Sequence, residues 1–129
     1  MVIDSSAVIA ILFNEPEAAH LAELIERAER RLICSISYLE SSMVVLSRKG
    51  SAGLQLLQAF MFRTGVEEIG FSPEQSIIAI DAYRRFGKGR HKASLNLGDC
   101  CSYALAKSLS LPIIFKGDYF SQTDLLVAT

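Results

Sequence analysis

The sequence lacks the features of a membrane protein, a secreted protein or a disordered chain. No apolar stretch approaches the roughly 18 residues of a membrane-spanning helix, and no basic leader precedes an apolar segment at the N-terminus. With 50% hydrophobic and 21% charged residues, the chain has too much apolar surface to remain unfolded. Its 129 residues predict one domain, residues 1–129, with a buried core.

Cysteine is scarce and odd in number. Of the three cysteines, Cys100 and Cys101 are adjacent, and none has a zinc-like spacing to His20 or His91. A disulfide framework or a zinc site is therefore the less favoured interpretation. We expect reduced thiols packed in the core of a cytoplasmic protein.

The chain also lacks an excess of charge of either sign, since its net charge is −1. A general attraction of the whole molecule to nucleic acid is therefore not expected. The local distribution differs, because residues 82–98 contain basic side chains and no acid. This stretch predicts a basic, glycine-hinged loop that binds phosphates. Its candidate binding residues are Arg84, Arg85, Lys88, Arg90, His91 and Lys92.

Short apolar segments alternate with amphipathic ones along the chain. Strands are expected at residues 2–3, 31–34, 66–69, 113–115 and 125–127. Helices are expected to begin near residues 5, 18, 37, 54, 73 and 97. This alternation is typical of a parallel sheet that helices cover on both faces. We therefore predict an α/β fold, a three-layer α/β/α sandwich with a central, mostly parallel sheet of four to five strands.

Polar residues mark several of the predicted helix boundaries. Asn14 predicts the start of the second helix, and Ser72 the start of a later one. Ser37 stands three residues before Glu40, the spacing of a capping box in which both side chains bond to the first turn. Gly50 predicts the end of the helix that Ser37 begins.

Four carboxylates stand where strands and loops turn into helices: Asp4, Glu40, Asp99 and Asp118. Two of them follow apolar strands, and the other two lie in the first turns of predicted helices. In a parallel sheet, the C-terminal ends of the strands and the following helix N-termini share one edge, where open α/β folds bind ligands. We therefore predict that the four acids meet at this edge.

Each of these acids also has a purely structural explanation. Carboxylates in first turns interact favourably with the helix dipole, Glu40 fits a capping box, and Asp118 fits an ordinary turn. Asp4 is harder to explain, because an acid that ends a core strand is poorly solvated without a partner. Crowded carboxylates repel one another unless a cation or raised pKa values compensate. An all-oxygen set suits Mg²⁺ or Mn²⁺, and the chemistry of such a site is hydrolysis of phosphodiesters.

Four segments form a specific combination. They are Met-Val-Ile-Asp-Ser-Ser-Ala at residues 1–7, the segment 37–40, the stretch from Gly87 that includes Leu-Asn-Leu-Gly-Asp-Cys at 95–100, and Phe-Lys-Gly-Asp-Tyr-Phe at 115–120 followed by Thr123-Asp124. Together they resemble PIN-domain ribonucleases, most of all the VapC toxins of bacterial type II toxin–antitoxin modules. The resemblance spans essentially the full chain. It implies a single α/β domain, Mg²⁺-dependent endoribonuclease activity on RNA, a homodimer, and a cognate VapB-type antitoxin that covers the site.

The resemblance also assigns roles by position. It implies that metal binding and catalysis rest on Asp4, Glu40, Asp99 and Asp118. Related chains often carry a second acid where this one has Tyr119, so Asp124 is an alternative to Asp118 as the fourth acid. Ser6 and Asn96 are the expected supporting groups beside the metal. One ion or two are both compatible with this set.

Other functions are less favoured by the sequence. A degenerate PIN-like module would bind RNA or a protein without cutting, yet the expected acids are present. A phosphoaspartate hydrolase needs a second acid where Ser6 stands, and no phosphate-binding glycine loop is found. His91 is interpreted as an exposed loop residue rather than as the base of a metal-free ribonuclease. The apolar residues of the predicted helices outnumber what one small sheet covers, so we expect some to face a second subunit or an antitoxin helix.

Overall fold

A parallel sheet of four strands forms the centre of the structure, a computed structural model that describes all residues from 1 to 129. Neighbouring strands follow the order β3-β2-β1-β4, and every pairing is parallel. The strands are β1 (Val2–Ile3), β2 (Leu32–Cys34), β3 (Glu67–Ile69) and β4 (Ile113–Ile114). Four of the five predicted strands are confirmed. The fifth predicted segment forms only an isolated bridge, between Val127 and Ile113.

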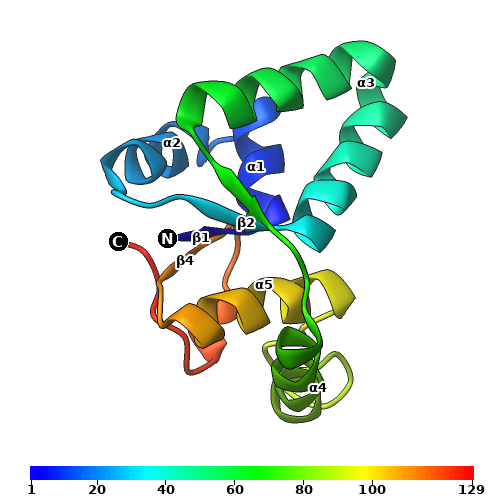
Figure 1. The fold of residues 1–129 in the computed structure, drawn as a ribbon, viewed down its shortest axis with the longest axis vertical. Helices are drawn as coiled ribbons and strands as arrows, with labels where there is room; N and C mark the ends of the chain where they lie inside the picture. Colours follow the sequence, from blue (N-terminus) through cyan, green and yellow to red (C-terminus); the bar gives the residue numbers. More distant parts are fainter.

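Helices cover both faces of this sheet (Figure 1). One face carries α1 (Ser5–Leu12), α2 (Ala18–Arg27) and α3 (Ser35–Thr64). The other carries α5 (Leu97–Leu109), with α4 (Pro73–Phe86) packed beside it, and a 3₁₀-helix, η1 (Phe120–Gln122), lies near the C-terminus. The predicted three-layer α/β/α sandwich is thereby confirmed. None of the helices combines the length and the apolar character that crossing a bilayer requires.

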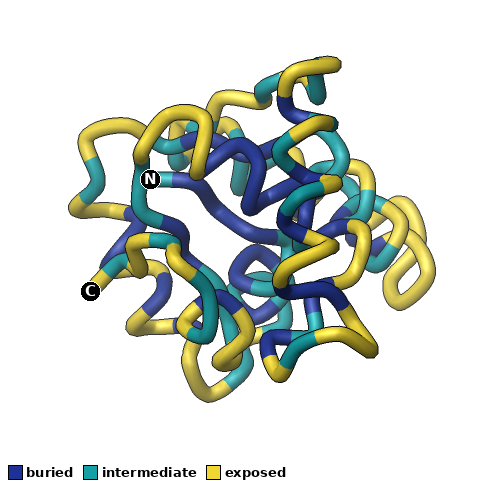
Figure 2. The backbone as a smooth tube through the Cα atoms, turned by 90° about the horizontal axis from the view of Figure 1, so that it is seen from below, coloured by how far each residue is buried: buried dark blue, intermediate teal, exposed yellow.

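The pleat of the strands divides their side chains between two cores. Successive residues of a strand point to opposite faces of the sheet. One core cluster, against α4 and α5, contains Val2, Leu32 and Ile113. The other, against α1, α2 and α3, contains Ile3, Ile33 and Ile114. All six are at most 2% exposed, and burying each contributes roughly 1.5–3 kcal/mol to stability. In Figure 2 the buried stretches of backbone gather in the middle of the molecule, with exposed loops around them.

Two of the predicted helix starts are confirmed by their caps. Ser72 caps α4, accepting from the backbone N–H of Gln75, whose side chain bonds back to the Ser72 N–H. Asn96 caps α5 in the same way, with Asp99 as its partner. Each such cap stabilises a helix by about 1 kcal/mol. At α5 the cap also fixes the place of one of the predicted site acids.

The other two predicted caps, Ser37 and Asn14, were wrong. α3 begins at Ser35, directly after β2, so Ser37 lies inside its first turn and Glu40 further along the helix. No side chain caps α3, because the chain passes from strand to helix without an intervening loop. Asn14 adopts a left-handed conformation with φ 50° and does not cap α2, which begins at Ala18, as the apolar spacing predicted.

α3 bends sharply at Gly50, where the sequence predicted that the helix ends. Gly50 has φ 60° and ψ −150°, a conformation essentially restricted to glycine. The two halves of α3 consequently run at an angle to each other (Figure 1). The first half stays beside the N-terminus of α1, so residues at its start remain near the end of β1.

Candidate active site

Asp4 follows β1 directly and is almost completely buried, with 2% of its surface exposed. Its Oδ2 accepts hydrogen bonds from the backbone N–H of Ser6, at 3.0 Å, and from the Ser6 hydroxyl, at 2.7 Å. Its Oδ1 accepts from the hydroxyl of Ser102 on α5, at 2.6 Å. Asp4 also caps α1, whose positive end favours a carboxylate at this position. The side chain is therefore held in one orientation by two helices.

Two buried serines, Ser37 and Ser102, are connected to Asp4 by consecutive hydrogen bonds. The Ser37 hydroxyl lies 2.8 Å from the Ser102 hydroxyl, and neither side chain is exposed. Because Ser102 donates its proton to Asp4, Ser37 must be the donor to Ser102. Ser37 therefore does not cap α3, although the sequence predicted that it would. Instead, its hydroxyl anchors Ser102, which in turn orients the Asp4 carboxylate.

Glu40 reaches the same region from α3. Its Oε1 accepts a hydrogen bond from the Ser5 hydroxyl at 2.5 Å. Its carboxylate lies against the N-terminus of α5, where a Cβ on Gly98 would come within 2.8 Å of Oε2 and 2.9 Å of Oε1. Glycine at position 98 is therefore what lets α3 and α5 bring their acids together.

Asp99 lies one residue further along α5. Its Oδ2 accepts the Asn96 N–H at 3.0 Å, which leaves Oδ1 without a hydrogen bond from the protein. The pKa of the Asp99 carboxyl is raised from its ordinary 3.8 to about 6. Burial is the largest cause, the hydrogen bond from Asn96 acts in the opposite direction, and the charges of Asp4 and Glu40 add to the increase. The three carboxylates thus repel one another electrostatically.

These three acids line one cleft of about 500 Å³. The cleft lies outside the C-terminal ends of β1 and β4, where the order of the strands reverses and α/β folds bind ligands. Ser6 and Asn96, the predicted supporting residues, line it as well. The Ser6 hydroxyl accepts the backbone N–H of Lys116 at 3.0 Å, which ties the segment after β4 to the start of α1.

The donor set of this cleft suits a divalent cation. Asp4, Glu40 and Asp99 form no ion pair with any basic side chain. Oε2 of Glu40 and Oδ1 of Asp99 accept no hydrogen bond from the protein. Oxygen ligands of this kind are those that Mg²⁺ and Mn²⁺ prefer. The acids line the same cleft, but no three of them lie close enough together to form a complete set of metal ligands.

The structure does not bring the fourth predicted acid into the cleft. Asp118 is exposed on the turn after β4 and does not line the cleft, whereas its neighbour Tyr119 does. Asp124, the alternative, is bonded instead to the hydroxyl of Tyr103, at 2.6 Å, and to Lys107, at 2.9 Å. The additional carboxylate in the cleft is that of Glu15, which was not among the predicted site residues.

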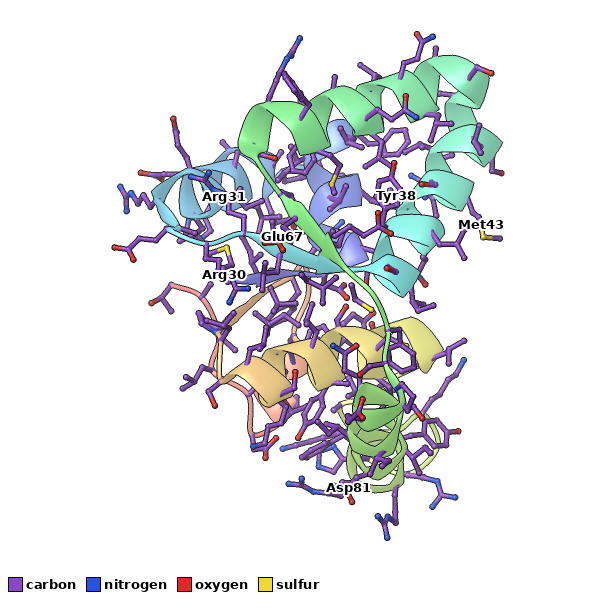
Figure 3. All side chains as sticks on the ribbon, in the orientation of Figure 1. Arg30, Arg31, Tyr38, Met43, Glu67 and Asp81 are labelled. Atoms are coloured by element: carbon purple, nitrogen blue, oxygen red, sulfur yellow. The ribbon has the colours of Figure 1, made fainter.

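Of the predicted phosphate-binding residues, only Lys88 lines the cleft. Arg84 and Arg85 belong to the last turn of α4, so the expectation that they form part of a loop was wrong. They pair with Asp81, at 2.7 and 3.5 Å, and Arg85 also reaches Asp124 at 3.3 Å. Figure 3 shows Asp81 on α4, the helix that packs beside α5.

Arg90 and His91, further along the basic segment, contact nearby residues of α4 and of the segment itself. Arg90 lies over the ring of Tyr83, at 5.7 Å from its centre. His91 packs edge-on against Phe86, and its Nδ1 accepts the backbone N–H of Ala93 at 3.0 Å. A histidine held in this way is part of the local packing of the loop.

Several residues of the site carried little signal in the sequence. Ser5 adjoins Asp4, and Gly98 adjoins Asp99, so their proximity to the motif was the available clue. Ser102 is 98 residues from Asp4 along the chain, and only the packing of α5 on β1 brings them together. Arg48 lies eight residues after Glu40, on the same face of α3, and it also lines the cleft.

Comparisons with known proteins agree with this architecture. The PIN domain matches residues 1–126. The chain is 45% identical over 124 residues to "Ribonuclease VapC" of Mycolicibacterium smegmatis, covering 96% of each chain. It is 42% identical over 125 residues to "VapC ribonuclease Mb0640" of Mycobacterium bovis, covering 97% of this chain and 95% of the relative.

Solved structures share the fold at low sequence identity. VapC20 of Mycobacterium tuberculosis, described as a sarcin–ricin loop cleaving toxin, superposes with a TM-score of 0.75 at 14% identity, covering 99% of this chain and 98% of the other. A chain of VapBC2 from Rickettsia felis, solved with a DNA fragment from the promoter, gives a TM-score of 0.75 at 17% identity, covering 98% and 94%. With the match to the PIN domain and the relatives above 40% identity, these findings establish that the chain belongs to the PIN-domain family, among the VapC ribonucleases.

Proposed function

We propose that the chain is an endoribonuclease that hydrolyses RNA phosphodiester bonds with the help of a divalent cation, Mg²⁺ or Mn²⁺. One observation carries the proposal: Asp4, Glu40 and Asp99 share a cleft, and none of them forms an ion pair with a basic side chain. The mutual repulsion of these acids is relieved when a cation binds between them. Membership of the VapC ribonucleases supplies the reaction class.

The three acids would hold the cation, which would supply positive charge to neutralise the phosphate and to make an attacking water more acidic. Asp4 would be the most firmly oriented ligand, because Ser6 and Ser102 fix both of its oxygens. Glu40 and Asp99 each keep one oxygen free, to face the cation or to accept a proton from the attacking water. Asn96 contributes by holding Asp99 at the start of α5.

The proposed function also implies protein partners and a cellular compartment. Structures with the same fold include "Toxin-antitoxin complex from Klebsiella pneumoniae", with a TM-score of 0.71 at 17% identity, and the VapBC2 protein of Rickettsia felis. We infer a VapB-type antitoxin as partner, and a homodimer. Apolar side chains on the surface support both, such as Met43 at 61% exposure, which projects from α3 away from the molecule (Figure 3). The three buried, unpaired cysteines suit a reducing cytoplasm.

The decisive experiment is incubation of the purified protein with total RNA, with Mg²⁺ or with EDTA. We expect cleavage with Mg²⁺ and none with EDTA. Asp4→Ala is expected to abolish cleavage, whereas Asp118→Ala, at an exposed acid outside the cleft, is the matched control and should retain it. Cleavage that persists in EDTA would overturn the metal-dependent mechanism.

The alternative, a degenerate module that binds without cutting, has no observation in its favour, since the three principal acids are present and face one cleft. Titration with Mn²⁺ separates the two functions independently of RNA. We expect saturable Mn²⁺ binding that Asp4→Ala weakens. Absence of metal binding in the folded wild type would favour the non-catalytic function.

A further inference from the structure

The cleft contains positive charge as well as carboxylates. Three basic side chains line it: Arg48 of α3, Lys88 after α4, and Lys116 after β4. Lys116 is already paired, with Glu15 at 2.6 Å and Glu17 at 3.9 Å. Arg48 and Lys88 form no ion pair with any acid of the chain. They are therefore the two basic groups of the cleft that remain available to an anion.

Arg48 is placed by the regularity of α3. Glu40, Val44 and Arg48 follow one another at intervals of four residues, so they lie on one face of the helix, and all three line the cleft. The rise of an α-helix puts the backbone of Arg48 about 12 Å from that of Glu40. Its guanidinium lies over the ring of Phe13, at 4.9 Å from the ring centre, which limits its freedom. The Arg48 guanidinium is therefore suited to bind a backbone phosphate adjacent to the phosphate that lies at the three acids.

Lys88 belongs to the segment that follows α4. Its backbone N–H donates to the carbonyl of Leu95 at 2.9 Å, so the start of the basic segment is fixed close to Asn96 and the entrance of α5. Lys92, only four residues later, is exposed and does not line the cleft. The two lysines thus differ in position although they share one short loop.

We propose that Arg48 and Lys88 bind the backbone phosphates of a single-stranded polynucleotide on either side of the bond at the acids, and that Arg84, Arg85, Arg90 and Lys92 do not. The inference rests on the proposed function, because it takes RNA as the ligand of the cleft. Its support is the placement of both residues in the cleft and their lack of a carboxylate partner. Arg84 and Arg85, by contrast, are neutralised by Asp81 and Asp124.

The test measures binding of a fluorescein-labelled single-stranded RNA in EDTA, by anisotropy at several NaCl concentrations. Arg48→Gln and Lys88→Gln are each expected to weaken binding by about three- to tenfold and to reduce the slope of log affinity against log salt by about 0.7. Two matched controls are Lys49→Gln, which removes a lysine that lies over the same Phe13 ring, and Lys92→Gln. Neither control residue lines the cleft, so each should change the affinity less than about twofold.

A second measurement excludes a merely structural effect. With Mg²⁺, Arg48→Gln should raise KM while kcat stays within about twofold, since the interaction is the same in substrate and transition state. Arg48→Lys should restore most of the affinity, and the melting temperatures of all variants should agree with that of the wild type. If the two controls lose as much affinity as Arg48→Gln and Lys88→Gln, or if none of the four loses any, the inference is overturned.

The two proposals fail in different ways. If the wild type cleaves RNA with Mg²⁺ but Arg48→Gln and Lys88→Gln bind like the controls, the phosphate-binding inference is wrong and the proposed function stands. If Arg48→Gln and Lys88→Gln selectively lose RNA binding in EDTA but the wild type does not cleave, the phosphate site stands and the nuclease function is wrong.

Discussion

At the Asp99 carboxyl, burial and the neighbouring charges of Asp4 and Glu40 act in the same direction. Burial raises the pKa most, and together these effects bring it to about 6 despite a hydrogen bond from Asn96 that lowers it. An acid whose pKa is higher in the folded than in the unfolded state stabilises the fold only while it is protonated. This contribution is present below the unfolded pKa of 3.8 and is lost as the pH rises through about 6.

We therefore predict that Asp99→Asn stabilises the metal-free protein near neutral pH. The amide oxygen can keep the hydrogen bond from Asn96 while the charge is removed. Urea unfolding in EDTA should give a free energy of unfolding about 1–2 kcal/mol above that of the wild type at pH 7, and the difference should shrink as the pH falls toward about 4. A variant less stable than the wild type at pH 7 would show that the Asp99 charge is not a source of strain.

Ser102 offers a second prediction for a single residue. Its hydroxyl is the only hydrogen-bond donor to Oδ1 of Asp4, so Ser102→Ala should loosen the orientation of that carboxylate. Residues that orient metal ligands typically change affinity or activity by about 10–100-fold, and we expect RNA cleavage to fall by about tenfold. The control is Ser41→Ala. Ser41 is also fully buried, but it lies in the first half of α3, and its hydroxyl bonds only to the Ser37 carbonyl. Equal activity losses in the two variants would contradict the positioning role.

At the scale of elements, the meeting of α3 and α5 depends on Gly98. We predict that Gly98→Ala lowers RNA cleavage by at least about tenfold, because the added methyl group takes the space of the Glu40 carboxylate. Stability should change little, since alanine favours a helix by up to about 1 kcal/mol relative to glycine and offsets part of the crowding. Measuring kcat together with the melting temperature separates the two effects.

The control for this substitution is Gly70→Ala, where an added Cβ meets nothing within 4 Å. It should leave cleavage unchanged. Full activity in Gly98→Ala would mean that Glu40 can move without loss of function, and would remove it from the catalytic set.

Elements whose signals are local could be predicted from the sequence. Three of the four strands, β1, β2 and β4, are short runs of apolar residues. The caps Ser72 and Asn96 bond to residues three positions away. The Ser37 prediction failed because a capping box needs a loop before the helix, whereas β2 runs straight into α3. The hydrogen bond between Ser37 and Ser102 joins residues 65 positions apart, and nothing in the spacing of a sequence encodes such a pair.

Among the predicted site acids, too, some positions could be predicted from the sequence and others could not. Asp4 and Asp99 could be placed from their positions at the ends of a strand and of a loop, because a parallel sheet gathers those ends on one edge. Asp118 could not, since the direction of a side chain on a turn depends on the local backbone. Here Gly117, with φ 102°, precedes Asp118, and it is Tyr119 that faces the cleft.

At the scale of the whole molecule, the net charge of −1 conceals a strongly uneven distribution. The acids sit together at the C-terminal edge of β1, while α4 carries its arginines in ion pairs on the outside. Long-range attraction of RNA to the molecule is consequently weak, and affinity has to arise within the cleft. Without a cation the three acids weaken phosphate binding next to them, so we expect Arg48 and Lys88 to supply the RNA affinity that remains in EDTA and a bound cation to raise it.

A cation that binds only the folded chain also stabilises the entire fold. Added Mg²⁺ at about 100 times its dissociation constant should stabilise the protein by about 2.7 kcal/mol, which for a chain of this size raises the melting temperature by roughly 10 °C. We predict this increase for the wild type and for Asp118→Asn, and a much smaller one for Asp4→Asn, in thermal melts without RNA. The comparison isolates the acid cluster, because both variants remove one carboxylate at the same edge of the sheet and only one of those carboxylates lines the cleft. An equal loss of the Mg²⁺ effect in both variants would place the cation outside the cleft, and no Mg²⁺ effect on the wild type would remove the cation from the mechanism.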